Sequence, residues 1–440
     1  MAQAVQSKRV VAPEEALSPR EQRIYRAAGM LRRATAIHVV LLLAAVVVGL
    51  LEGLGIPLLS PFKSAMLFRF GGSPGTSLAL TMMLLMVNMS ALLVLMVGLM
   101  AREWWALVSV WLLAAANVAL LWIYGYSPGI VPLIATGVAG GIAVQDLRAY
   151  RTNPVMLKEL RGRMRGMRAF IVLTVYLGLM SGFMALVYLT FTSFDNNLSS
   201  AAAGSAGQLL FMGVVGMEML LIIFIAPAFT AGAITGERER QTYDLLQTTL
   251  LASPSFVMGK LESALSYILL LLLAAIPLQS LAFLFGGVSQ AEVLIAFVIL
   301  AVTAIALGTV GIYFSAIAPR TLSASVRTYT VALVSAFGVP FVLGLLVSAL
   351  LNIGNLTPLT ETALRYTQQI LTSLNPVLTA LESQQFITNQ QGIGFTQLTL
   401  RSSGNTIPIV SPWISFTIIY LAISAVLLVM TIREMRKIEA

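Results

Sequence analysis

Long apolar stretches recur along the whole chain, and short polar or turn-forming segments separate them. A bilayer core about 30 Å thick is crossed by about 20 helical residues, so each stretch of that length predicts a membrane-spanning helix. Ten such stretches occur. The predicted spans are 37–59, 78–101, 104–124, 128–145, 169–191, 207–235, 257–286, 291–318, 326–351 and 412–432.

A different pattern lies between the fourth and fifth spans. Leu157, Leu160, Met164 and Met167 follow one another at spacings of three, four and three residues, which places them on one helical stripe. The other positions carry Lys158, Arg161, Arg163, Arg165 and Arg168. This pattern predicts a basic amphipathic helix over 146–168 that lies at the cytoplasmic membrane interface, with a solvated basic loop as the alternative. The helix separates a four-helix region, 37–145, from a six-helix core, 169–440.

Two further segments lie outside the predicted spans. In the tail 1–36, Ser18, Pro19 and Glu21 occupy the positions of a helix N-cap, first helical residue and capping-box acid, so we expect an amphipathic helix there. The first apolar stretch follows late and shows no compact cleavage site, so no signal peptide is predicted. The polar segment 352–411 combines a helical pattern with a hairpin-like pattern in "GFTQLTLRSSGNTIPI". We expect a small folded external domain.

Composition agrees with a membrane protein. The chain is 58% hydrophobic and 10% charged, with a mean hydropathy of +0.89, whereas a soluble domain is about 25% charged. The fold class predicted is therefore an all-α integral membrane protein. With both termini in the cytoplasm, 23 of the 27 Lys and Arg residues lie on the cytoplasmic side, as the positive-inside rule requires. The net charge of +9 follows from this topology, so it indicates no nucleic-acid partner, although anionic membrane lipid could attract it.

Several kinds of chemistry are excluded by residue types. The chain has no cysteine and His38 is its one histidine, which excludes disulfides, thiolate metal sites and haem held by two histidines of this chain. Gly259 and Lys260 form its one Gly-Lys pair, but Leu261 follows them and no glycine stands at the P-loop spacing. We therefore predict a chain that is not an enzyme, holds no metal or cofactor and cannot hydrolyse ATP.

The densest group of charges follows the sixth predicted span. Five of the 45 charged residues fall within the eight positions 237–244, and Pro254 comes before the next span. We expect a cytoplasmic helix over 237–250. Its mixed-charge, partly aromatic surface suits docking to another protein, although a solvated connector explains it equally well. The residues of this surface are Glu237, Arg238, Glu239, Arg240, Tyr243 and Asp244.

The segment "GERERQTYDLLQTTLLASPSFVMGK" resembles the signature of permease subunits of ABC transporters of the type-2 exporter family. Three more stretches resemble that family in the right order: "NPVMLKELRGRMRGMRAF", "GIYFSAIAPRTLSASV" and "LNPVLTALE". The resemblance covers 153–440. It departs from the family at Gln241, where glycine is common, and at the four helices before residue 146, which lie outside the minimal six-helix core. Those helices could bind a partner or lipid, or enlarge the fold.

The resemblance implies a function and partners. In the family, the charged helix is the coupling helix that sits in a groove of a separate ATPase subunit. The six charged and aromatic residues of 237–244 named above would then contact the ATPase, which would bind ATP and Mg²⁺. A second permease copy or a paralogue would complete the transporter, which works by alternating access. We expect a multi-pass protein of a prokaryotic cytoplasmic membrane.

Glu52 and Glu218 are the two carboxylates predicted to lie inside the membrane. Burying an ionised carboxylate at mid-helix costs about 2.5–3.5 kcal/mol, so Glu52 and Glu218 should face protein or water. Either could form a substrate or proton site, and Glu52 could also be a hydrated side chain near the external end of its helix. Two alternative functions remain open. One is a non-transporting scaffold subunit of a larger membrane complex, and the other is an ATP-independent carrier, which the scarcity of intramembrane charge disfavours.

Overall fold

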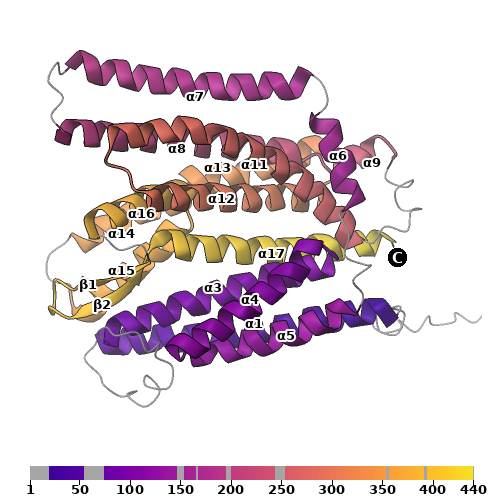
Figure 1. Ribbon diagram of the computed structural model, residues 1–440, viewed down its shortest axis with the longest axis horizontal. Helices are drawn as coiled ribbons and strands as arrows, with labels where there is room; N and C mark the ends of the chain where they lie inside the picture. Colours follow the sequence, from indigo (N-terminus) through magenta and orange to yellow (C-terminus); the bar gives the residue numbers. More distant parts are fainter. Residues whose placement is uncertain are drawn as a thin grey trace, which may run out of the picture.

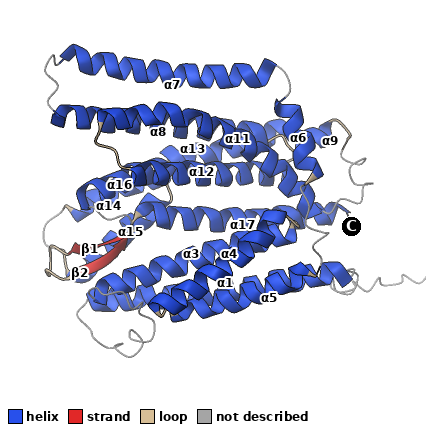
Figure 2. Ribbon diagram, viewed as in Figure 1, coloured by secondary structure: helices blue, strands red, loops and turns tan. Residues whose placement is uncertain are grey.

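The computed structural model describes residues 19–53, 74–145, 153–164, 167–194, 200–242, 253–352, 356–390 and 394–439. Within these residues it is an all-α integral membrane protein, with ten spans that are long and apolar enough to cross a membrane. Figure 2 shows helices almost everywhere, and the described strands form one small hairpin. The fold class predicted from hydropathy is confirmed.

The described part of the N-terminal region contains four long helices. Its first helix differs from the prediction, because α1 runs unbroken through both the expected tail helix and the first span, and its apolar window begins earlier, at Gln22–Ala45. No proline interrupts 20–53, so the helix has no reason to end between the two parts. The elements are α1 (Pro19–Gly53), α3 (Pro74–Met100), α4 (Trp104–Tyr124), the 3₁₀ turn η1 (Ser127–Gly129) and α5 (Ile130–Val144).

Among the described residues, the connecting helix and the core follow with eight helices through the end of the ninth span. The elements are α6 (Pro154–Met164), α7 (Met167–Phe194), α8 (Ser200–Thr230), α9 (Thr235–Glu239), α11 (Ser253–Phe285), α12 (Gln290–Ile317), α13 (Thr321–Phe337) and α14 (Val339–Leu351). The ninth span is two helices rather than one, since α13 ends at Gly338 and Pro340 stands in the first turn of α14.

The chain ends with α15 (Pro358–Ser373), α16 (Pro376–Gln390), strands β1 (Phe395–Thr399) and β2 (Thr406–Val410), and α17 (Pro412–Glu439). The strands pair antiparallel, from Phe395 opposite Val410 to Thr399 opposite Thr406. The helix and hairpin predicted in 352–411 are therefore present. Helix α16 was not predicted, because its polar sequence has no clear apolar stripe.

Figure 1 shows how these elements are arranged. α7 lies along one side of the bundle next to α8, and α1, α3, α4 and α5 lie on the opposite side, where α3 packs against α17. α1 begins and α17 ends at the end of the bundle that also holds α6 and α9, and the guanidinium of Arg436 lies 5.0 Å from the ring centre of Tyr25. We call this the α9 end, and the opposite one, with the strands and α14 to α16, the hairpin end.

Two apolar clusters hold the bundle together. The larger one joins α7, α8, α11, α12, α13 and α17. The second joins the N-terminal helices to α11, α12 and α17 close to the α9 end. Gly311 permits the close approach of α8 and α12, because a Cβ there would lie 2.8 Å from the Cβ of Thr230. The two regions of the sequence therefore share one packed interior at the α9 end.

Candidate functional site

The charged segment after α8 is shorter and less regular than predicted. Helix α9 ends at Glu239, and Gln241 has a φ of 57°, the left-handed conformation that glycine adopts most readily. The backbone N–H of Thr242 donates to the carbonyl of Glu237 at 3.0 Å, and the Thr242 hydroxyl donates to the Glu237 carboxylate. These bonds close the chain into a turn. The predicted helix over 237–250 is thus wrong at 240–242, and 243–250 lies outside the described residues.

An ion pair with Lys260 links Glu237 to other helices of the same chain. The ammonium of Lys260 in α11 lies 2.8 Å from the Glu237 carboxylate and 2.6 Å from that of Glu159 in α6. Lys260 is only 4% exposed, and a buried ammonium requires such compensation. The three side chains therefore connect α6, α9 and α11.

The next two charged residues, Arg238 and Glu239, form hydrogen bonds to the ends of α12 and α13. Arg238 donates from Nη1 to the carbonyl of Ala316 at 2.8 Å, in the last turn of α12, where backbone carbonyls lack helical partners. The Glu239 carboxylate accepts from the Thr321 backbone N–H at 2.7 Å and from its hydroxyl at 2.8 Å. Because Thr321 is the first residue of α13, Glu239 acts as an acidic cap supplied by another element.

The backbone at the start of α9 is held by hydrogen bonds to α12. The hydroxyl oxygen of Ser315 in α12 accepts from the N–H groups of Ile234 and Thr235, at 2.9 and 3.0 Å. Since Ile234, Thr235 and Ser315 are all buried, these bonds are shielded from water. Four helices, α6, α11, α12 and α13, therefore fix the position of α9.

The six predicted partner contacts now separate into groups. Glu237 and Arg238 are half-buried and engaged within the chain, while Glu239 and Arg240 are exposed. Tyr243 and Asp244 lie outside the described residues. Sequence reasoning did not find the anchoring residues Glu159, Lys260, Ser315 and Thr321. One signal for Lys260 was present, since a lysine inside a predicted membrane span needs a counter-charge.

Helix α6 exposes apolar residues on one side and turns Arg163 toward the protein interior on another. Leu157 and Met164 of the predicted stripe are 38% and 42% exposed, so these apolar residues of α6 face outward, as an interfacial helix requires, while Met167 already belongs to α7. Arg163, which was expected on the solvated face, instead turns inward. Its Nη2 donates to the carbonyl of Phe229 at 3.2 Å, and its guanidinium lies 5.2 Å from the centre of the Phe229 ring. A cation is stabilised there by the carboxyl-terminal end of α8.

The intramembrane carboxylates differ in how far they can be described. Glu218 in α8 is fully buried, as predicted, and Gln279 of α11 donates to its Oε2 at 2.8 Å. Its Oε1 has no hydrogen-bond partner among the described residues. The side chain of Glu52, in the last turn of α1, lies outside the described part. Among the described residues, no group of three or more His, Cys, Asp or Glu side chains could hold a metal.

A second polar cluster joins the N-terminal region to the core. Asn153, just before α6, donates to Glu103 at 3.1 Å and also to the carbonyl of Ser255 in α11. Trp105 donates to Glu262 at 3.2 Å. Burial raises the pKa of Glu103, and the bond from Asn153 opposes this shift only in part. The beginning of α4 is therefore fastened to the beginning of α11, directly after the charged segment.

Comparisons of the chain with protein-family models, with curated proteins and with solved structures find no match. A functional assignment therefore depends on the residues of this chain and on how they are arranged.

Proposed function

We propose that the chain is the membrane-spanning permease subunit of an ATP-binding-cassette exporter, which moves a substrate by alternating access driven by a separate ATPase subunit. The supporting observation is the short charged helix α9, which four neighbouring helices hold while Glu239 and Arg240 remain exposed. Both termini and α9 would face the cytoplasm of a prokaryotic cell, where the ATPase resides.

The anchors of α9 explain how force would reach the membrane helices. A partner that displaces α9 must also displace the Lys260 ion pairs in α11, the Glu239 cap on α13 and the Ser315 bonds to α12. Short polar contacts deform little, above all those of Lys260 and Ser315, which are buried, so they transmit movement rather than absorb it. The ATPase would bind ATP and Mg²⁺, and a second permease copy or a paralogue would complete the complex.

One observation favours a second candidate, a non-transporting scaffold subunit. α4 presents a broad apolar face, on which Trp111, Leu112 and Trp122 are 46%, 64% and 89% exposed. A face of this kind contacts lipid or another membrane subunit. Because α4 is fastened to α11 near α9, the additional helices could connect such a subunit to the same end of the core.

The docking proposal predicts the effect of a single charge reversal. Arg240→Glu removes an exposed cation that makes no hydrogen bond or ion pair among the described residues, so folding should be unaffected. We expect the amount of P-loop ATPase that co-purifies after mild detergent extraction from native membranes to fall at least about tenfold, as loss of a buried interfacial charge pair does. Mass spectrometry of the extract measures this amount.

Arg401→Glu is the matched control, because Arg401 is exposed at the hairpin end. ATPase recovery should not change in this variant. Equal recovery from the wild type and Arg240→Glu would rule out docking through Arg240. Recovery of integral membrane subunits without any P-loop protein would favour the scaffold.

A further inference from the structure

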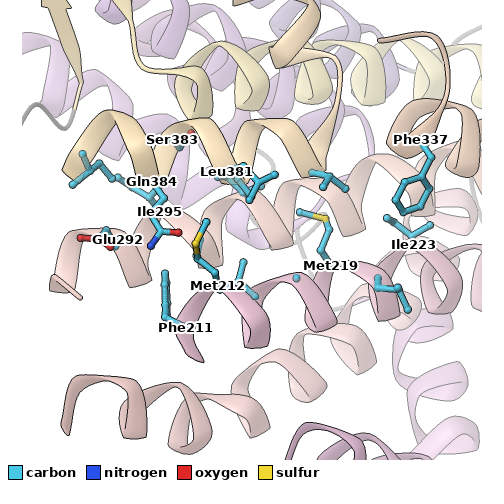
Figure 3. Close-up of a pocket in the computed structure, with 18 residues that line it drawn as sticks. Phe211, Met212, Met219, Ile223, Glu292, Ile295, Phe337, Leu381, Ser383 and Gln384 are labelled. Carbon is cyan, nitrogen blue, oxygen red and sulfur yellow. The ribbon is translucent and has the colours of Figure 1, made fainter. Parts of the chain in front are cut away.

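A cavity of about 180 Å³ lies within the core, between α8, α12 and α16 and beside the end of α13. Figure 3 shows the side chains that line it. Most are apolar, among them Phe211, Met219, Ile223, Ile295 and Phe337. The charged segment α9 is at the other end of the bundle, so this cavity is separate from the docking site.

One end of the cavity is polar. Figure 3 shows Glu292 and Gln384 close together there, Ser383 on the other side of the α16 ribbon, and Ile223 and Phe337 toward the opposite end of the cavity. Glu292 stands in the first turn of α12 and is 7% exposed, and Ser383 in α16 is 1% exposed. The polar end is thus a buried one, formed by two helices.

Two polar atoms at this end lack partners. Glu292 Oε1 accepts from the backbone N–H of Ser289 at 3.2 Å and from its hydroxyl at 2.9 Å, which completes a capping box. Glu292 Oε2 and Ser383 Oγ have no hydrogen-bond partner among the described residues. Buried polar atoms are nearly always satisfied, so the unpartnered carboxylate oxygen at this end of the cavity is a place where a hydrogen-bond donor of a ligand would be stabilised.

The apolar end of the cavity reaches the surface. Leu220, Phe337 and Leu381 line the cavity and are also 44%, 52% and 40% exposed. In a membrane-spanning bundle, an apolar opening of this kind admits hydrocarbon. An apolar cavity of about 150 Å³ is known to hold benzene, so this one has room for a head group or a short part of an alkyl chain, with the rest of the chain leaving through the opening.

We propose that this cavity binds an amphiphile that carries an ammonium head group and an alkyl chain. The ammonium donates a hydrogen bond to Glu292 Oε2 and compensates the carboxylate, while the chain lies along the apolar residues. No Lys or Arg is among the described residues that line the cavity, so an anionic head group would meet the carboxylate unpaired. The assignment does not depend on an ATPase partner.

Photolabelling of the purified full-length chain in a neutral detergent tests the proposal. The probe is dodecylamine with a photoreactive diazirine in its chain, and dodecanol with the same diazirine is the reference. We expect the amine to label peptides of α8, α12 and α16 several-fold more strongly than the alcohol. Glu292→Gln keeps the size and the capping oxygen but removes the charge, so it should lower amine labelling about tenfold or more and leave alcohol labelling unchanged.

A second variant tests the proposal independently, in case Glu292→Gln fails to fold. Gly216 in α8 lines the cavity, and an added Cβ would meet no atom within 4 Å, so Gly216→Leu fills the space without strain. This variant should abolish labelling of these peptides by both probes. Gly178→Leu is the control, because an added Cβ at Gly178 in α7 also meets nothing within 4 Å, and Gly178 is not among the residues that line the cavity.

Equal labelling by amine and alcohol, or labelling that survives Gly216→Leu, would overturn the proposal by showing mere partition into the surface. Where labelling behaves as expected, competition identifies the source of the ligand. Competition by phosphatidylethanolamine in mixed micelles indicates an amine-headed bilayer lipid, and competition by unlabelled dodecylamine alone indicates a free alkylamine. Either result supports the binding of an ammonium amphiphile in this cavity.

Discussion

Lys260 is the residue on which the geometry of the α9 end most depends. Its ammonium is buried between two carboxylates that belong to α6 and α9, and both are about one quarter exposed. An ion pair with one deeply buried member is worth more than a surface pair but less than a fully buried one. Removing the cation would deprive Glu159 and Glu237 of the counter-charge that they share.

Lys260→Gln should therefore destabilise the chain by about 1–3 kcal/mol. Thermal unfolding of the purified protein in detergent measures this loss as a lower Tm. Arg161→Gln serves as the control, because Arg161 is exposed on α6 and its replacement should change stability by no more than about 0.5 kcal/mol. An unchanged Tm in Lys260→Gln would mean that the three side chains do not hold α9.

Sequence patterns predict which residues are unusual better than they predict which residues meet. The density of charge at 237–240 and the intramembrane position of Glu218 were both visible in the sequence, and Glu218 is buried as expected. The partner of Glu237 was not visible in the sequence. Lys260 is 23 residues away along the chain, and the sequence pattern of the intervening segment does not predict its path. Side-chain pairing depends on tertiary packing, which local sequence patterns do not reveal.

At the scale of elements, the hairpin depends on one carboxylate of α15. Glu361 accepts from the backbone N–H groups of Arg401 at 3.0 Å and Ser402 at 2.9 Å, in the loop between β1 and β2. Burial of Glu361 favours the neutral acid, but the bonds from Ser402 and Arg401 and the charge of Arg365 outweigh burial and lower its pKa. The carboxylate form therefore fastens the hairpin to α15.

This arrangement predicts a pH dependence of the hairpin. Because the folded-state pKa of Glu361 lies below the ordinary value of 4.5, the stabilisation is complete above about pH 4.5 and is lost as the pH falls through the folded-state pKa. Hydrogen exchange at the amides of Arg401 and Ser402 should show protection that falls with pH in this range. Glu361→Gln should reduce protection about fivefold near neutral pH and remove its pH dependence. Equal protection in the two proteins would contradict this role.

Element boundaries were predicted where the apolar pattern changes abruptly. The span 104–124 matches α4, since charged Glu103 and Gly125 with φ 66° enclose it. The prediction was wrong where the end of a helix depends on local hydrogen bonding, as at the turn of Gln241. The start of the first span was placed too late, because no helix breaker separates it from the preceding tail helix in α1. Polar α16 was missed because its helix is stabilised by packing against α12 and α17 rather than by its own pattern.

At the scale of the whole molecule, the N-terminal region and the core are joined near α9. The shared apolar cluster and the bonds of Glu103 and Glu262 bring α4 to the beginning of α11. A movement of α9 would therefore reach the additional helices as well as the core. The number and order of spans followed from hydropathy, whereas this junction could not, because it brings together residues about 150 positions apart.

The central claim is that an ATPase docks at α9, and site-specific crosslinking in intact native membranes tests it most directly. A photoreactive amino acid replaces Arg240, which is exposed, and in a second sample it replaces exposed Arg401 at the hairpin end. Mass spectrometry then identifies the crosslinked protein. We predict that position 240 captures a soluble protein with a P-loop and that position 401 does not. Capture of integral membrane proteins alone at position 240, or of no protein, would contradict the claim.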